Sequence, residues 1–327
     1  MVAFKRVAAV SVLGLILCSG LFAQNTNILD TYFDGDELNR RVRNYAINVS
    51  NLIPDSTAIS NVWSFAPKAR GGWFGAGLNG SITLLDRKRV SSLIDDFEGF
   101  GGSHQDLSQF PEAIPFLPGA AVDLRVGINR MDIGLNGMWV DSDILMENLG
   151  TSFLGENSSF SYRSFGVDLR YAIVTDGGKI FSFSSPLLPA LTVQAGYYFT
   201  WLGFGIESGN EKVSVDFRND TYFVALQASK NLVLITPYIG LKLIFSKTDS
   251  GFSWETDRPV MVKGSPYPDG ARYNSGGVEG DTFTYFQFYG GLGLTLTLVE
   301  INAGFAYNVV TEHFGISFSA RYLLGGM

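Results

Sequence analysis

The sequence predicts an all-β protein, an antiparallel transmembrane β-barrel of about ten strands, within a range of roughly 8 to 14, with an N-terminal helical segment. Three observations predict it: segments that alternate apolar and polar residues, connections that alternate between long and short, and polar faces built from small residues with few charges. Segment 164–174 carries Phe165 and Val167 on one face and Asp168 and Arg170 on the other. Because successive side chains of a strand point to opposite sides, one face suits lipid and the other a polar interior.

Residues 1–23 are typical of a secretory signal peptide, with positive residues before the apolar run 7–17 and Ala23 directly before a polar stretch. Cleavage after Ala23 removes Cys18, the chain's single cysteine, so we expect neither disulfides nor thiol chemistry. Lipidation of Cys18 is the alternative, and the large Leu17 before it argues against that interpretation.

The chain is acidic. It has 24 Lys and Arg against 31 Asp and Glu, and loss of Lys5 and Arg6 with the signal peptide leaves 22 against 31, a net charge of −9. This charge excludes nucleic acid as an expected partner. The expected partners are the lipid of the cell outer membrane, the barrel assembly machinery and a small solute, and no cofactor is expected.

We expect residues 24–69 to form a helical segment that acts as a plug or lies beside the barrel in the periplasm. We expect residues 70–327 to form the outer-membrane barrel. Asp36 can cap this helix. Its apolar positions recur at helical spacing: Leu38, Val42, Tyr45, Ala46, Val49 and Leu52. Residues 90–97 repeat the same spacing and predict a short helix in the first outer loop.

The period-2 pattern places the barrel strands. We expect them near 71–84, 119–128, 131–140, 160–174, 189–206, 220–230, 234–247, 281–298, 300–309 and 313–324. The stretch 180–206 is long and uncharged enough for a transmembrane helix, but its alternation favours a strand.

The connections between these strands alternate in length. The long ones are 85–118, 141–159, 207–219 and 248–280, and the tight ones are 129–130, 231–233 and Val299 alone. Short turns beside the chain ends and long loops outside are typical of barrels with both termini in the periplasm. Connections 175–188 and 310–312 break the rule, and a hairpin hidden in 175–188 or 248–280 leaves twelve strands open.

The alternative fold is a soluble β-sandwich, whose polar face would meet bulk water and carry many Lys and Glu. Here the polar face is small and sparsely charged, which favours a confined lumen. The candidate lumen-lining residues are Asp123, Arg125, Asp132, Asn136, Asp168, Arg170, Gln194, Lys242, Gln287, Asn302 and Arg321. Trp139 and Trp201 near outer strand ends, with Tyr171 and Tyr322 near inner ones, predict two aromatic girdles.

The residues needed for most catalysis and metal binding are scarce. His104 and His313 are the two histidines of the chain, and neither has a partner at a metal-binding or catalytic spacing. We therefore expect no enzyme, no catalytic residue and no metal site.

Short motifs suggest relatives. The run 48–57, then Asn61-Val62-Trp63 and 117–121, resembles uncharacterised outer-membrane barrel proteins of spirochaetes. An N-terminal helical segment ahead of a barrel is distantly similar to the long-chain fatty-acid transporter family, which implies a hydrophobic substrate; no ligand-binding residue aligns.

About ten strands leave a narrow lumen, because eight strands hold little beyond side chains and sixteen open a wide channel. The leading hypothesis is a narrow or plugged channel or transporter for small solutes, hydrophobic ones among them. The second hypothesis is a structural or adhesin-like surface protein that acts through loops 85–118 and 248–280.

Overall fold

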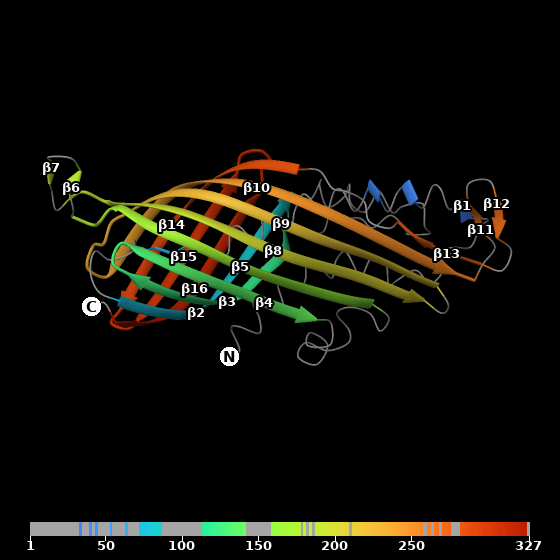
Figure 1. The fold of residues 1–327 in the computed structure, drawn as a ribbon, viewed down its shortest axis with the longest axis horizontal. Helices are drawn as coiled ribbons and strands as arrows, with labels where there is room; N and C mark the ends of the chain where they lie inside the picture. Colours follow the sequence, from blue (N-terminus) through green and yellow to red (C-terminus); the bar gives the residue numbers. More distant parts are fainter. Residues whose placement is uncertain are drawn as a thin grey trace.

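The structure is a computed structural model of the chain. It describes residues 33–34, 39–40, 43–44, 53, 63–64, 72–86, 113–141, 158–177, 179–180, 183–184, 187–208, 211–257, 260–262, 265–267, 270–275 and 282–325. The predicted signal peptide 1–23, the loop helix 90–97 and His104 lie outside these residues. The described part is an elongated, twisted β-barrel (Figure 1).

Ten strands form a closed antiparallel ring. They are β2 (Gly72–Asp86), β3 (Ala113–Ile128), β4 (Met131–Asp141), β5 (Ser158–Val174), β8 (Ala190–Ser208), β9 (Glu211–Ser229), β10 (Ile235–Thr256), β14 (Thr282–Leu296), β15 (Val299–Asn308) and β16 (Phe314–Gly325). Each pairs with the next along the chain, and β16 pairs with β2 to close the ring. Closure leaves no free sheet edge among these strands, as a bilayer requires. The prediction of a barrel of about ten strands is confirmed.

The barrel has two unlike ends. At the turn end, β2 begins, β16 finishes and the connections 129–130 and 297–298 are tight. At the loop end, longer connections such as 87–112 and 142–157 join the strands. Gly72 and Gly325 therefore lie at the turn end, as the alternation of loop lengths predicts.

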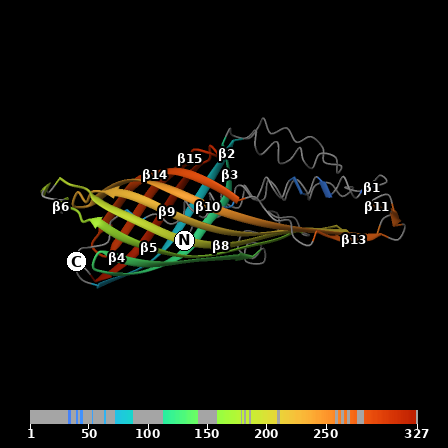
Figure 2. The same ribbon diagram turned by 45° about the horizontal axis from the view of Figure 1, so that its top comes forward.

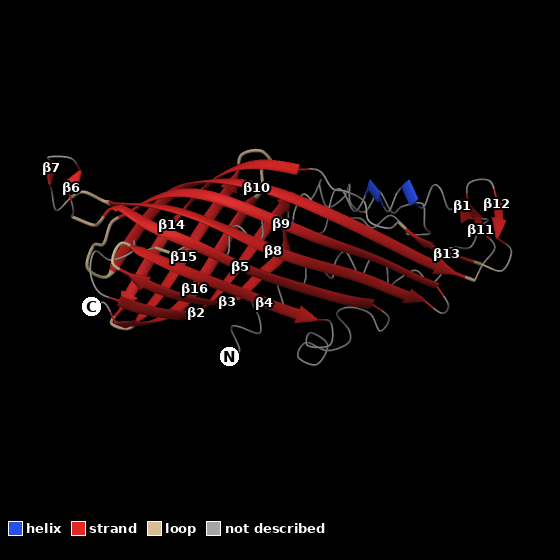
Figure 3. Ribbon diagram, viewed as in Figure 1, coloured by secondary structure: helices blue, strands red, loops and turns tan. Residues whose placement is uncertain are grey.

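Small strands lie outside the ring. The connection after β5 holds a hairpin of β6 (Lys179–Ile180) and β7 (Phe183–Ser184), seen at the far end in Figure 3. The connection after β10 holds β11 (Val260–Val262), β12 (Ser265–Tyr267) and β13 (Ala271–Asn274). None of the five inserts into the closed ring, so the count stays at ten and the twelve-strand alternative is wrong.

The prediction of a long connection at 207–219 is also wrong. Strands β8 and β9 stay paired up to Ser208 and Glu211, so residues 209–210 alone join them. Likewise β10 continues to Thr256 and pairs there with β13. These extensions of β8, β9 and β10 beyond the other strands are visible in Figure 2. The sequence predicts loops here because outward residues such as Asp216, Arg218 and Asp249 interrupt the apolar alternation.

The predicted N-terminal helix falls largely outside the described residues. Asn39–Arg40 and Arg43–Asn44 have helical backbone, and the helix as a whole stays a prediction. Within the part of the chain that the structure describes, no helix is long and apolar enough to cross a membrane.

The barrel has an apolar outer surface and a polar interior, the reverse of a soluble protein. Outward residues along its middle are large and apolar, for example Leu135 at 55% exposure and Phe165 at 53%. Inward residues on the same strands are polar and buried, for example Asp132 at 1% and Asp168 at 2%. Trp139 also faces outward near the loop end, and Tyr171 near the turn end. An apolar outer belt around a polar interior is the arrangement of barrels that sit in lipid.

Candidate functional site: the barrel lumen

The barrel interior holds every residue proposed from the sequence to line it. All are 8% exposed or less: Asp123, Arg125, Asp132, Asn136, Asp168, Arg170, Gln194, Lys242, Gln287, Asn302 and Arg321. Alternate side chains of each strand point into the barrel, and closure of the ring buries this inner face of the sheet.

One wall of the lumen is an ion-pair network on β3, β4 and β5. Arg125 pairs with Asp132 and, through two contacts of 2.6 and 2.7 Å, with Asp168. Arg170 donates to both oxygens of Asp132, from Nε at 2.9 Å and from Nη2 at 2.7 Å. The amide of Gln194 donates to Asp168 at 2.9 Å. Two arginines thus share one carboxylate, an arrangement that compensates charge in a confined space.

A second group of charges lies beside this network, around Arg321 on β16. Its Nε donates to Asp123 at 3.1 Å and its Nη2 donates to the amide oxygen of Asn79 at 2.9 Å. Glu300 of β15 lies 4.0 Å from the guanidinium and accepts a hydrogen bond from Ser64. Sequence reasoning missed Glu300, although it shares the inward parity of Asn302 on the same strand.

The N-terminal segment reaches this charged wall. The Trp63 side chain is 1% exposed, and its ring lies 4.0 Å from the guanidinium carbon of Arg321, 4.9 Å from that of Arg125 and 5.4 Å from that of Arg170. The carbonyl of Trp63 accepts a hydrogen bond of 2.8 Å from the Gln227 amide on β9. A desolvated cation over an indole contributes about 2 kcal/mol, so three such contacts anchor residue 63 firmly. Periodicity gives no sign of this role, since Trp63 follows the helical pattern.

The path of the segment follows from three contacts. Phe33 and Asp34 (β1) pair in parallel with Val260 and Met261 of β11, at the loop end. The indole nitrogen of Trp254, near the loop end of β10, donates to the side chain of Asn39 at 3.0 Å. Residues 63–64 then lie among the lumen side chains, and Gly72 begins β2 at the turn end. The described residues of the segment thus include Asn39 at the loop end, residues 63–64 inside the lumen and Gly72 at the turn end.

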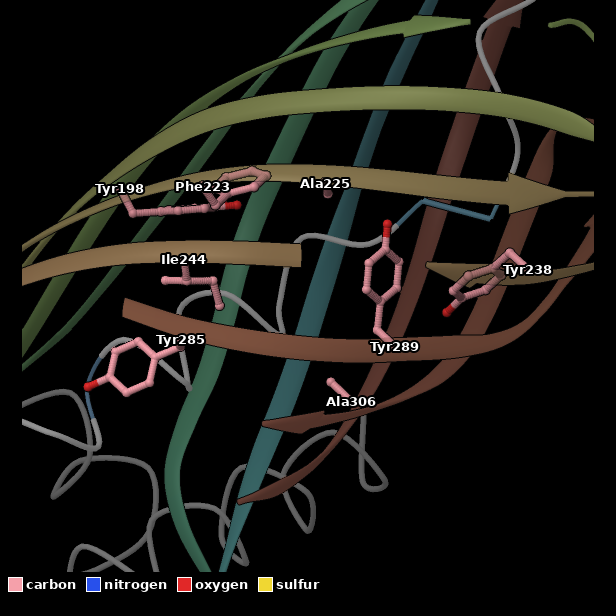
Figure 4. Packing of buried hydrophobic residues seen from close by; sticks show 8 residues of the cluster. All are labelled: Tyr198, Phe223, Ala225, Tyr238, Ile244, Tyr285, Tyr289 and Ala306. Atoms are coloured by element: carbon pink, nitrogen blue, oxygen red, sulfur yellow. The ribbon is translucent and has the colours of Figure 1, made fainter. Parts of the chain in front are cut away.

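The opposite wall of the lumen is aromatic. Tyr198, Phe223, Tyr238, Tyr285 and Tyr289 form a buried cluster with Ala225, Ile244 and Ala306 on β8, β9, β10, β14 and β15 (Figure 4). The lumen therefore has one ionic face and one aromatic face.

Lys242 contacts the aromatic face and also interacts electrostatically with Asp168 of the ion-pair network. Its ammonium lies 4.9 Å from the Phe223 ring centroid and 5.4 Å from that of Tyr289. Asn302 accepts a hydrogen bond from the Tyr238 hydroxyl at 3.0 Å. Asn136 and Gln287 make no side-chain amide hydrogen bond within the described part, and both are buried. These two amides are among the buried polar groups of the described residues that a solute or water inside the lumen would contact.

Inward glycines make room for these large side chains. A Cβ at Gly134 would overlap the guanidinium of Arg125 and the carboxylate of Asp168, and one at Gly293 would overlap the hydroxyl of Ser64. Small residues opposite large ones fill a narrow barrel without voids. The sequence places small residues where the network and the N-terminal segment need space.

The lumen holds charged groups of both signs. Four buried cations (Arg125, Arg170, Lys242 and Arg321) face four buried carboxylates (Asp123, Asp132, Asp168 and Glu300), so these charges balance. Among the described residues, no group of His, Cys, Asp or Glu could hold a metal ion. His313 is buried in the β15–β16 connection, away from these clusters.

Comparison with known proteins adds little beyond architecture. No protein-family model matches the chain, and no curated protein sequence matches it. Among solved structures, the translocator domain of the autotransporter NalP from Neisseria meningitidis is 9% identical over 78% of this chain and 88% of its own, with a TM-score of 0.36. The β-domain of the Bordetella autotransporter BrkA is 10% identical over 77% and 99%, with a TM-score of 0.33. The monoaromatic hydrocarbon channel CymD is 11% identical over 79% and 89%, with a TM-score of 0.21.

All three are barrels, but the scores are too low to support an argument, so the class of protein rests on the chain's own strand pairing and polarity. These define a closed ten-stranded β-barrel with a lipid-compatible exterior and a filled polar lumen. The resemblances to spirochaete barrels and to fatty-acid transporters stay predictions.

Proposed function

We propose that the protein is an outer-membrane β-barrel that acts as a narrow channel and is closed at rest by its N-terminal segment. The main observation behind the proposal is that the indole ring of Trp63 packs against three arginines of the lumen. A segment that only filled space in the lumen would need no more than apolar packing. Trp63 is instead held by cation–π contacts and a backbone hydrogen bond at the charged wall of the lumen. Without Trp63, that wall would face the channel.

The solute class follows from the two faces of the lumen. Balanced charges give no reason for strong selection of anions over cations. The aromatic face and the free amides of Asn136 and Gln287 offer stacking and hydrogen bonds. The channel therefore suits small solutes with both an apolar part and a polar group, rather than bulk ions.

The test is the conductance of refolded protein in planar bilayers, together with swelling of protein-loaded liposomes in small aromatic and aliphatic solutes. Trp63→Ala keeps the chain length and removes the three ring contacts. We expect rare, brief openings in the wild type and frequent or sustained openings in the variant. The control is Phe165→Ala, which removes an outward ring and leaves the lumen unchanged.

Deletion of residues 24–69 provides a second test, since it removes the segment outright. Folding of each protein is checked by the shift in gel mobility on heating, which folded barrels show. If wild type, Trp63→Ala and the folded deletion variant are all equally silent, the channel proposal is wrong. Equal high conductance in all three would show that the segment does not close the lumen.

A second function has one observation in its favour. Strands β8, β9 and β10 extend past the apolar belt and carry charged outward residues such as Lys212, Asp216 and Glu255. An ordered sheet outside the membrane is a suitable surface for contact with other molecules. Binding to a surface ligand that survives shortening of these strands to residues 206, 214 and 250 would refute this adhesin-like role.

A further inference from the structure

A row of alternating tryptophan and arginine residues crosses the outer surface of five strands. Strand register places Trp139 of β4 opposite Arg163 of β5, Arg163 opposite Trp201 of β8, Trp201 opposite Arg218 of β9, and Arg218 opposite Asp249 of β10. We call these five residues the interfacial row. All of them have outward strand parity.

The row lies where the apolar belt ends. Toward the turn end, the outward residues include Leu135 on β4 and Phe165 on β5. On β9 and β10 the charged pair Asp220 and Lys247 comes first, and the apolar belt begins one pair further on, at Tyr222 and Phe245. Toward the loop end they include Asp141 and Asp216. In a membrane this boundary falls at the level of the lipid headgroups, where tryptophan side chains gather in barrels.

The arginines of the row are held by aromatic rings. The guanidinium carbon of Arg163 lies 4.1 Å from the ring centroid of Trp139 and 4.9 Å from that of Trp201, so the cation contacts both rings. The guanidinium of Arg218 lies 5.1 Å from the Phe199 ring. Contact through the flat face leaves the N–H edge of a guanidinium open to an acceptor.

The protein pairs both guanidiniums with carboxylates, but only at long range. The nearest carboxylates, Asp141 for Arg163 and Asp220 for Arg218, lie 3.8 Å away, beyond hydrogen-bond length. Within the described residues neither guanidinium donates a hydrogen bond, and the Nε of Arg163 is buried without an acceptor. An ordered cation with an unsatisfied donor edge is a site for an anion.

We propose that Arg163 and Arg218 bind the phosphate groups of an anionic lipid whose acyl chains lie on the apolar belt below. One strand, β8, lies between them, so they are two strand spacings apart, a distance of roughly 10 Å. That distance suits two phosphates of one large headgroup or two neighbouring headgroups. The inference requires the barrel to lie in a membrane and is independent of whether the lumen conducts.

The test is the relative affinity of the refolded barrel for brominated phosphatidylglycerol over brominated phosphatidylcholine in mixed vesicles, measured by quenching of tryptophan fluorescence. Trp139 and Trp201 lie in the row and report on lipid there. Each interfacial arginine contributes about a factor of five to anionic-lipid binding. We therefore expect a preference of roughly 25-fold in the wild type, from the product of the two factors, and close to none in Arg163→Gln/Arg218→Gln.

The matched control is Arg272→Gln, because Arg272 is exposed on β13 beyond the belt and pairs with Glu255. It should keep the wild-type preference. An equal preference in wild type and double variant would overturn the proposal. Fluorescence changes caused by inorganic phosphate in pure phosphatidylcholine vesicles, with no preference for the anionic lipid, would identify a soluble-anion site and overturn the lipid assignment.

Discussion

Replacement of Arg125 by glutamine should destabilise the barrel more than any exposed charge change. Arg125 is fully buried and pairs with both Asp132 and Asp168. After its removal Asp132 keeps the two hydrogen bonds from Arg170, whereas Asp168 keeps the hydrogen bond from the neutral Gln194 amide. Removal of one partner from a buried ion pair costs 3 to 5 kcal/mol, so we expect a loss of about 4 kcal/mol.

The cost should arise mainly from the charge of Asp168, which loses its two short contacts with Arg125, although the Gln194 amide and the charge of Lys242 still compensate it in part. The double variant Arg125→Gln/Asp168→Asn removes that charge as well, and it should recover more than half of the loss. The exposed pair of Arg272 and Glu255 supplies the comparison, because Arg272→Gln should cost less than about 1 kcal/mol.

The assay is reversible urea unfolding in lipid vesicles, followed by tryptophan fluorescence, which gives the free energy of unfolding for each variant. If Arg125→Gln lowers the free energy of unfolding by less than about 1 kcal/mol, Arg125 does not compensate buried carboxylates as described. If the double variant is as unstable as the single one, the charge of Asp168 is not the main cause.

Four further variants test the barrel by the same unfolding assay. Thr297 has a φ of 52° in the tight β14–β15 turn; Thr297→Gly should stabilise by about 1 kcal/mol because a β-branched residue is strained there, and no gain would contradict that explanation. Gly134→Ala should cost about 2 kcal/mol by displacing Arg125, while Gly137→Ala, whose Cβ would lie 3.7 Å from the Phe165 ring, should be nearly neutral. Leu135→Lys on the outward face should cost about 3 kcal/mol in lipid; a neutral effect would point to a water-exposed surface.

The sequence predicts the ring and its inward face well, for a physical reason. Period-2 alternation is imposed by lipid outside and a confined polar space inside, so it is strong between the membrane boundaries. The alternation alone is enough to place Asp132, Arg170 and Lys242 on the inward face. Glu300 follows from the same parity, since it lies two residues before the inward Asn302.

The alternation fails where the lipid ends. Beyond the interfacial row, outward residues become polar, as at Asp216, while inward ones such as Phe217 and Phe252 become apolar. The pattern inverts, and the strand extensions look like loops. The position of Trp63 could not be predicted either, because it lies beyond the helical spacing of residues 38–52 and its cation–π contacts are with Arg125, Arg170 and Arg321 on three distant strands.

The most direct test of the account is the side of the membrane on which each end of the N-terminal segment lies. In a Cys18→Ser background, single cysteines at Asp34 and at Asn231 are probed in cells with a maleimide too large to cross the outer membrane. Asp34 belongs to β1 at the loop end, and Asn231 is exposed at the turn end. The account predicts labelling of Asp34→Cys in intact cells and of Asn231→Cys only after lysis. The account would be contradicted if Asp34→Cys were labelled only after lysis while other loop-end residues were labelled in intact cells, because residue 34 would then lie on the periplasmic side.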